Sequence, residues 1–144
     1  MKSIHILLVE DNDGDILLTT EALEECKLVN NVTVLKNGKE AIDYMQKKGK
    51  YVDVDFPDMV LLDVNLPLKS GHEVLQAIKN DDATRHIPVI MLTTSCAERD
   101  IMLSYKHYAN AFITKPIDVF DFLKAITSIE QFWFNIVSLP SQTN

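Results

Sequence analysis

The chain has 144 residues, 47% of them hydrophobic, and a formal net charge of −7, which together indicate one compact domain with a packed core. It has neither an apolar run of the ~18 residues that a membrane-spanning helix needs nor a signal-peptide pattern, so we expect a cytoplasmic protein. The acidic balance argues against a nucleic-acid partner, because phosphate binding needs clustered lysine and arginine. Cys26 and Cys96 form no CxxC motif and are interpreted as reduced thiols.

Short apolar runs alternate with segments of helical spacing along the chain. The runs predicted as strands are 4–9, 32–35, 59–62, 89–92 and 111–113. The helices between and after them are marked by apolar residues at helical spacing: Ile16, Leu23 and Cys26, then Ala41, Tyr44 and Met45, then Val74, Leu75 and Ile78, then Ile101, Tyr105 and Tyr108, and last Val119, Phe122, Leu123, Ile126, Ile129 and Trp133. Asp13 is the expected N-cap of the first helix.

The order of elements is a strand followed by a helix, five times over. The strands are too apolar to leave one face in water, which predicts a parallel sheet with helices on both faces. Right-handed crossovers restrict such an α/β sheet to a few doubly wound orders, among which the pattern alone does not choose. In the order 2-1-3-4-5, ligands would bind between the first and third strands, beyond their carboxyl ends.

Three carboxylates come at the ends of the first and third predicted strands. Glu10 and Asp11 follow the first, and Asp63 follows the third. Two like charges ~4 Å apart cost about 4 kcal/mol at an effective dielectric of about 20, so a cluster needs a cation, a shared proton or wide separation. Mg²⁺ suits such a cluster, because it is hard, prefers oxygen and takes one or two carboxylates. The alternative is that Asp11 and Asp13 merely begin a helix while water solvates Asp63.

Thr93 and Lys115 follow the fourth and fifth predicted strands. A hydroxyl and an ammonium at one sheet edge can both bind phosphoryl oxygens, and Pro116 would fix the backbone that aims Lys115, a cis bond being one way to do so. Taken singly, Lys115 can be a solvated loop lysine and Thr93 an ordinary strand residue. Those interpretations leave unexplained why polar groups end the first, third, fourth and fifth strands together.

Five motifs resemble the receiver domain of two-component response regulators. In chain order they are LLVEDN at 7–12, MVLLDVNLP at 59–67, Gly71, PVIMLTTS at 88–95 and ITKP at 113–116. The resemblance implies a flavodoxin-like (βα)5 fold, a doubly wound parallel sheet of order 2-1-3-4-5 with helices on both faces. It also implies a receiver domain over 1–131 and a short apolar extension over 132–144, with no separate effector domain.

The same resemblance implies that Asp63 is the phosphorylated aspartate. Glu10 and Asp11 would hold Mg²⁺, directly or through water, together with Asp63 and the backbone carbonyl of Asn65. The acidic pair is Glu-Asp rather than the commoner Asp-Asp, a variant that leaves metal binding expected. A sensor histidine kinase would donate the phosphoryl group from a phosphohistidine, in a Mg²⁺-dependent transfer.

Three more positions acquire roles from the resemblance. Lys115 would contact the phosphoryl group, Thr93 would be the switch hydroxyl, and Phe112 would occupy the aromatic switch position. The alternative for Phe112 is a plain core phenylalanine, because the surrounding strand is apolar. Phosphorylation would then reshape the surface of the fourth helix, fifth strand and fifth helix, through which the protein would signal by contacts. Ser70 stands before Gly71 where an Asp is frequent, which we expect to affect only a turn.

The segment FWFNIVSLP at 132–140 and the LTTS motif are similar to small receiver proteins that partner bacterial phytochromes. This likeness implies a phytochrome-type histidine kinase as partner, and a homodimer with Phe132, Trp133 and Phe134 at its interface. The alternative is that these aromatic side chains pack on their own domain.

Other functions fit parts of the pattern. A Mg²⁺-dependent phosphohydrolase would use Asp63 as a turnover nucleophile, but such phosphatases commonly carry a second acid two residues later, where this chain has Asn65. A flavin-binding module would need a phosphate loop after the first strand, where residues 10–13 read EDND and repel phosphate. An unphosphorylated interaction module and a phosphorelay shuttle also stay open.

Overall fold

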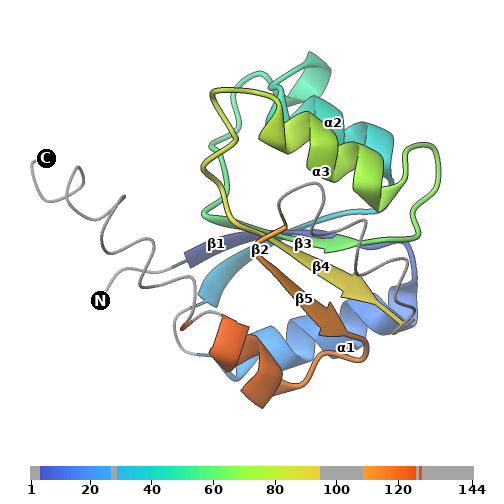
Figure 1. The fold of residues 1–144 in the computed structure, drawn as a ribbon, viewed down its shortest axis with the longest axis vertical. Coiled ribbons are helices and arrows are strands. Elements are labelled where there is room, and N and C mark those ends of the chain that lie inside the picture. Colours follow the sequence, from blue (N-terminus) through green and yellow to red (C-terminus); the bar gives the residue numbers. More distant parts are fainter. Residues whose placement is uncertain (1–3, 27–28, 95–108, 126, 128–144) are drawn as a thin grey trace, which may run out of the picture.

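The computed structural model describes residues 4–26, 29–94, 109–125 and 127. They form one five-stranded parallel sheet with helices on both faces (Figure 1). The strands are β1 (Ile4–Val9), β2 (Val29–Leu35), β3 (Met59–Asp63), β4 (Val89–Thr93) and β5 (Ala111–Thr114). Their order in the sheet is β2-β1-β3-β4-β5, so the predicted fold class and strand order are confirmed.

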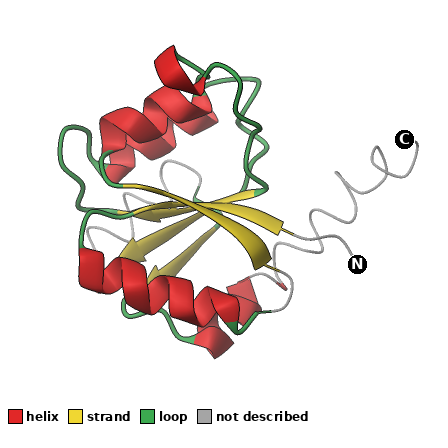
Figure 2. Cartoon of the chain, turned by 180° about the vertical axis from the view of Figure 1, so that it is seen from behind, coloured by secondary structure: helices red, strands yellow, loops and turns green. Residues whose placement is uncertain are grey.

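Two layers of helices enclose the sheet (Figures 1 and 2). The helices are α1 (Asp13–Glu24), α2 (Gly38–Met45) and α3 (Gly71–Lys79), with a 3₁₀ turn, η1 (Gly49–Tyr51), and a helical segment at 119–125. One face is covered by α1 and the segment 119–125, and the other by α2 and α3. The predicted helix around Ile101 and most of the last predicted helix beyond 125 lie outside the described residues. Within the part described, no helix has the length and apolar character needed to cross a bilayer.

The sheet separates two apolar cores. β1 supplies Leu7 and Val9 to the core beneath α2 and α3, and Ile6 and Leu8 to the core beneath α1. β3 and β4 alternate in the same way, and every residue of both strands is buried. Because both faces are covered, β3 and β4 are continuously apolar up to their last residues, Asp63 and Thr93, rather than alternating in polarity. Burying each large aliphatic side chain contributes roughly 1.5–3 kcal/mol, which holds the carboxyl ends of the strands firmly in place.

The start of α1 differs from the sequence-based expectation by one residue. Asn12, not Asp13, is the N-cap: its backbone is extended, and its side chain accepts a hydrogen bond from the backbone N–H of Asp15 at 2.9 Å. Asp13 is the first helical residue, and its exposed carboxylate pairs with Lys36 at 2.7 Å. Both Asn and Asp are good N-caps, so residue type alone could not choose between them.

The loop between β3 and α3 is closed by two adjacent residues. Ser70, expected to affect only a turn, is the N-cap of α3 and forms a capping box with Glu73. Gly71 packs directly on the end of β3, because a Cβ there would collide with the backbone oxygen of Asp63. Its N–H donates to the carbonyl of Val64 at 2.9 Å. These contacts fix the backbone that carries Asp63.

Candidate functional site

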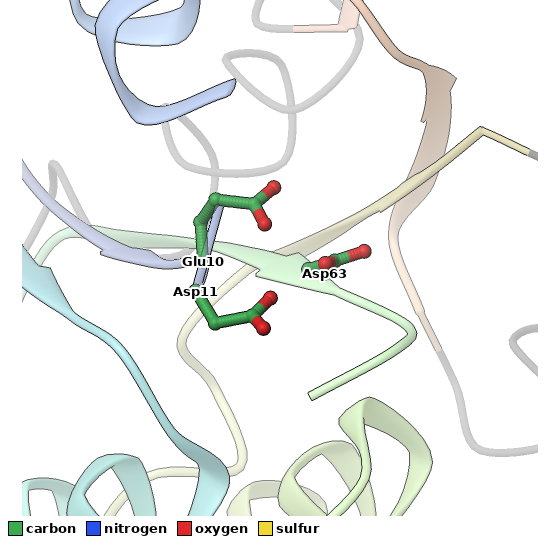
Figure 3. Close-up of side chains that lie close together, drawn as sticks. All are labelled: Glu10, Asp11 and Asp63. Carbon is green, nitrogen blue, oxygen red and sulfur yellow. The ribbon is translucent and has the colours of Figure 1, made fainter. Parts of the chain in front are cut away.

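The carboxyl ends of β1 and β3 bring three acidic side chains together (Figure 3). Glu10 and Asp11 follow β1, Asp63 ends β3, and one oxygen of each lies within 4.8 Å of the others. Glu10 has no exposed surface and Asp63 is 3% exposed, whereas Asp11 is exposed. The structure therefore brings together the three carboxylates that the sequence placed at neighbouring strand ends.

Strand alternation explains why two of these carboxylates meet a lysine. The last strand residues in the core beneath α1 are Leu8 of β1, Leu61 of β3 and Ile113 of β5. Glu10, Asp63 and Lys115 each lie two residues further along, so they continue the face that α1 covers. The backbone N–H of Glu10 donates to the backbone carbonyl of Leu35 in β2 at 2.9 Å, which extends the hydrogen bonding between β1 and β2 to the site.

Lys115 is buried among carboxylates, with its side chain only 6% exposed. Its Nζ lies 2.7 Å from Oε1 of Glu10, 2.9 Å from Oδ2 of Asp15 and 3.3 Å from Oδ2 of Asp63. Its backbone N–H donates to the carbonyl of Thr93 at 2.8 Å, and the Lys115–Pro116 peptide bond is cis. The lysine expected at the edge of the sheet is thus at the centre of the charged cluster.

The cluster shifts the pKa of two of its members. Burial raises the pKa of Glu10 to about 7, helped by the charge of Asp63 and opposed by the hydrogen bond from Lys115. For Lys115, burial lowers the pKa, but the hydrogen bonds to Glu10 and Asp15 and the charge of Asp63 outweigh it and raise the pKa well above its ordinary value. The ammonium therefore stays charged at neutral pH, while Glu10 is poised between its two protonation states.

Asp15 is a member of the site that sequence reasoning missed. It lies in the first turn of α1, and its carboxylate approaches Lys115 from the helix rather than from a strand end. A signal was present in the sequence: Asp15 comes three residues after the N-cap Asn12, in the turn nearest the acidic pair. Finding the contact also required knowing how α1 is rotated over the sheet, which helical periodicity does not supply.

The remaining predicted site residues lie around this cluster. Thr93 ends β4, is fully buried and stands opposite Thr114 in the sheet register. Phe112 is half-buried against the core beneath α2 and α3, with Met91 as its register partner. Asn65 is exposed, and its backbone N–H lies 3.4 Å from Oδ1 of Asp63. The predicted interface residues Phe132, Trp133 and Phe134 lie outside the described residues.

The three-carboxylate cluster fits a hard divalent cation. Its donors are all oxygen atoms, the choice of Mg²⁺ and Mn²⁺ rather than of softer metals. Lys115 occupies Oε1 of Glu10 and Oδ2 of Asp63. The other two oxygens, Oε2 of Glu10 and Oδ1 of Asp63, each accept one backbone N–H, at 3.2 and 3.4 Å, and have a second lone pair for a cation. Two buried carboxylates and one exposed carboxylate also match an ion that keeps some of its water.

Comparison with known proteins gives a consistent result. The family model described as "Response regulator receiver domain" matches residues 6–127. Response regulator Rcp1 of Synechocystis is 39% identical over 136 residues, covering 94% of this chain and 92% of Rcp1. The crystal structure of the Mn²⁺-bound form of Rcp1 superposes with a TM-score of 0.75 at 38% identity, over 93% of this chain and 96% of that one.

Two further solved structures are similar over most of their length. The bacteriophytochrome response regulator AtBRR has a TM-score of 0.81 and 47% identity, covering 92% of this chain and 96% of its own. The phosphorylated cyanobacterial phytochrome response regulator RcpA has a TM-score of 0.77 and 41% identity, covering 92% and 94%. An acidic metal site is typical of receivers, and the cluster of Glu10, Asp11 and Asp63 is such a site. The chain belongs to the response regulator receiver family, and is a signalling protein of two-component systems, phosphorylated on an aspartate, rather than an enzyme.

Proposed function

We propose that Asp63 is the aspartate that accepts the phosphoryl group from a sensor histidine kinase. The observation that carries this assignment is its place in the sheet: β3 is the central strand, so Asp63 lies between the acidic pair after β1 and Lys115 after β5. Glu10 is a poorer nucleophile here, because its contacts with Lys115 at 2.7 Å and with the backbone of Asn12 at 3.2 Å are shorter than those of Asp63, which lie at 3.3 and 3.4 Å.

In the transfer, an oxygen of Asp63 attacks the phosphorus of a phosphohistidine, and the P–N bond breaks as the P–O bond forms. Lys115 offsets the negative charge of the phosphoryl oxygens from its buried position 3.3 Å from Asp63. Glu10, Asp11, Asp63 and the backbone carbonyl of Asn65 would hold Mg²⁺, which when bound supplies charge neutralisation and alignment for in-line displacement. The Mn²⁺-bound form of Rcp1 supports a divalent cation in this role.

The switch that reads the phosphoryl group would consist of Thr93 and Phe112. Both continue the sheet face beneath α2 and α3: Thr93 lies two residues beyond Met91, which is the register partner of Phe112. A hydrogen bond from the Thr93 hydroxyl to a phosphoryl oxygen would draw the end of β4 inward and free space into which Phe112 rotates. The output surface would then include β5, the helix after it and the predicted helix around Ile101, which lies outside the described residues.

We infer a histidine kinase of the phytochrome type as the phosphoryl donor. RcpA and AtBRR, which are 41% and 47% identical to this chain, are response regulators of a cyanobacterial phytochrome and of a bacteriophytochrome. A homodimer through Phe132, Trp133 and Phe134 belongs to the same proposal and rests on the sequence of the segment alone. Analytical ultracentrifugation of the full chain and of a variant with these three residues changed to Ser tests it.

The assignment of Asp63 is tested by intact-mass spectrometry after treatment with acetyl phosphate, with and without Mg²⁺. We expect a Mg²⁺-dependent gain of one phosphoryl group, which Asp63→Asn abolishes. Asp53→Asn is the matched control, because it makes the same chemical change at an exposed position in the loop before β3, at the opposite edge of the sheet. An Asp63→Asn protein phosphorylated to the same extent as the wild type would contradict the assignment.

A further inference from the structure

We propose that Asp15 is a positioning residue for phosphoryl transfer, which holds the Lys115 ammonium so that one N–H remains directed at the phosphoryl group on Asp63. The inference rests on the proposed function of Asp63 and Lys115. It adds to that function a residue of α1 that belongs neither to the three-carboxylate cluster found among the described residues nor to the predicted switch.

The geometry around the ammonium supports this role. A lysine ammonium has three N–H donors. Two of them donate to Oε1 of Glu10 at 2.7 Å and to Oδ2 of Asp15 at 2.9 Å. Oδ2 of Asp63 lies 3.3 Å away as an ion-pair partner. The lysine side chain is long and flexible, so two carboxylates on different elements restrict the position of its end, and the third donor is left for the site of phosphorylation.

Asp15 differs from Glu10 in what else it contacts. Glu10 lies in the three-carboxylate cluster, so a bound divalent cation would be coordinated by the same carboxylate that holds Lys115. Asp15 is 27% exposed and approaches the ammonium from the helix, which leaves it as the partner of Lys115 when Glu10 is shared. The backbone N–H of Asp15 is held by the side chain of Asn12 at 2.9 Å, so its place in the first turn is itself fixed.

The same helical turn provides a matched control. Asp13 is also an acid in the first turn of α1, so its replacement removes one negative charge and its favourable interaction with the helix dipole, as replacement of Asp15 does. Its carboxylate, however, is 82% exposed and pairs with Lys36 rather than with Lys115. The comparison of Asp15→Asn with Asp13→Asn therefore isolates the contact with Lys115.

The kinetic test measures the rate of phosphorylation by acetyl phosphate at saturating Mg²⁺. We expect Asp15→Asn to lower the maximal rate about five- to twentyfold, as loss of a charge-assisted hydrogen bond does, and Asp13→Asn to change it less than about twofold. The Mg²⁺ concentration for half-maximal rate should change less than about twofold in both. In a Lys115→Gln background, Asp15→Asn should cause no further loss. An unchanged or faster rate for Asp15→Asn, or equal losses in both backgrounds, would overturn the proposal.

A second measurement needs neither metal nor phosphoryl donor. In the metal-free protein, the ¹⁵N signal of the Lys115 ammonium should be protected from solvent exchange, and this protection should be lost in Asp15→Asn but kept in Asp13→Asn. Persistence of the signal in Asp15→Asn overturns the inference whatever the kinetics. A wild-type protein that has the protected ammonium but gains no phosphoryl group contradicts the proposed function instead, so the two failures are distinguishable.

Discussion

The ammonium of Lys115 lies 2.7 Å from a carboxylate 105 positions earlier in the chain, that of Glu10, which has no exposed surface. A parallel sheet permits this contact between distant residues, because the strands that carry them end at the same edge, and the long lysine side chain spans the ends of β4 and β3. The ion pair offsets part of the cost of burying Glu10, yet the pKa of Glu10 still rises to about 7. Burial of this carboxylate therefore lowers the stability of the metal-free protein, and a bound cation would offset that loss.

Glu10→Gln should stabilise the metal-free protein at alkaline pH. The folded-state pKa of Glu10, about 7, is above its ordinary value of 4.5, so the unfolded chain loses this proton first and wild-type stability falls as pH rises from about 4.5 to 7. We expect Glu10→Gln to be more stable at pH 8 by on the order of 2–3 kcal/mol, and equal to the wild type near pH 4.5. Urea unfolding at both pH values measures this difference; a less stable variant at pH 8 would contradict it.

Cation binding should depend on the same proton. Glu10 must be deprotonated to contribute to a metal site, so Mg²⁺ affinity should rise with pH through about 7 and level off above it. Isothermal titration calorimetry at pH 6 and pH 8 should show a wild-type affinity about tenfold higher at pH 8. Glu10→Gln should bind more weakly and lose most of this pH dependence. The same tenfold change in the variant would show that another group is responsible.

Gly71→Ala should damage the site without changing a charged residue. A Cβ at position 71 would collide with the backbone oxygen of Asp63, so the end of β3 or the start of α3 must shift. We expect a loss of about 2 kcal/mol or more and a slower phosphorylation of Asp63. Ser70→Ala is the control: it removes the neighbouring capping box, which costs about 1 kcal/mol, but leaves the contact with β3 intact. Equal phosphorylation rates in the two variants would argue against this account.

Thr93→Val should separate phosphorylation from its structural consequence. Valine keeps the shape and burial of Thr93 but removes the hydroxyl proposed to bind the phosphoryl group. We expect mass spectrometry to show a normal gain on Asp63, while NMR shows a much smaller change in the signals of β5, including Phe112, on phosphorylation. A full response of β5 in the variant would remove Thr93 from the switch.

The fold and the acidic cluster could be predicted from the sequence because both depend on local patterns. The apolar runs located β1, β3 and β4 closely, and once the sheet was parallel, Glu10 and Asp63 had to end at one edge. The first three residues of β2, 29–31, were not predicted as part of a strand, because Asn30 and Asn31 interrupt its apolar pattern. Edge strands tolerate such residues, because one side of the strand has no neighbour.

The contact of Asp15 with Lys115 could not be predicted, because it depends on tertiary packing. It requires the rotation of α1 about its axis, its height over the sheet and the path of the chain after β5, none of which one-dimensional spacing supplies. The N-cap of α1 could not be predicted from the sequence either. Asn12 and Asp13 are both suitable caps, and only the extended backbone at Asn12 decides between them.

Asn12 connects the two carboxylates that hold Lys115. Its backbone N–H donates to Oε2 of Glu10 at 3.2 Å, and its side-chain oxygen accepts from the backbone of Asp15 at 2.9 Å. One neutral residue thus sets the spacing between a strand-borne and a helix-borne anion. If Asp15 positions Lys115 as proposed, exchanging this uncharged amide at the start of a helix would change the rate of phosphoryl transfer, with every acid, base and hydroxyl of the reaction left in place.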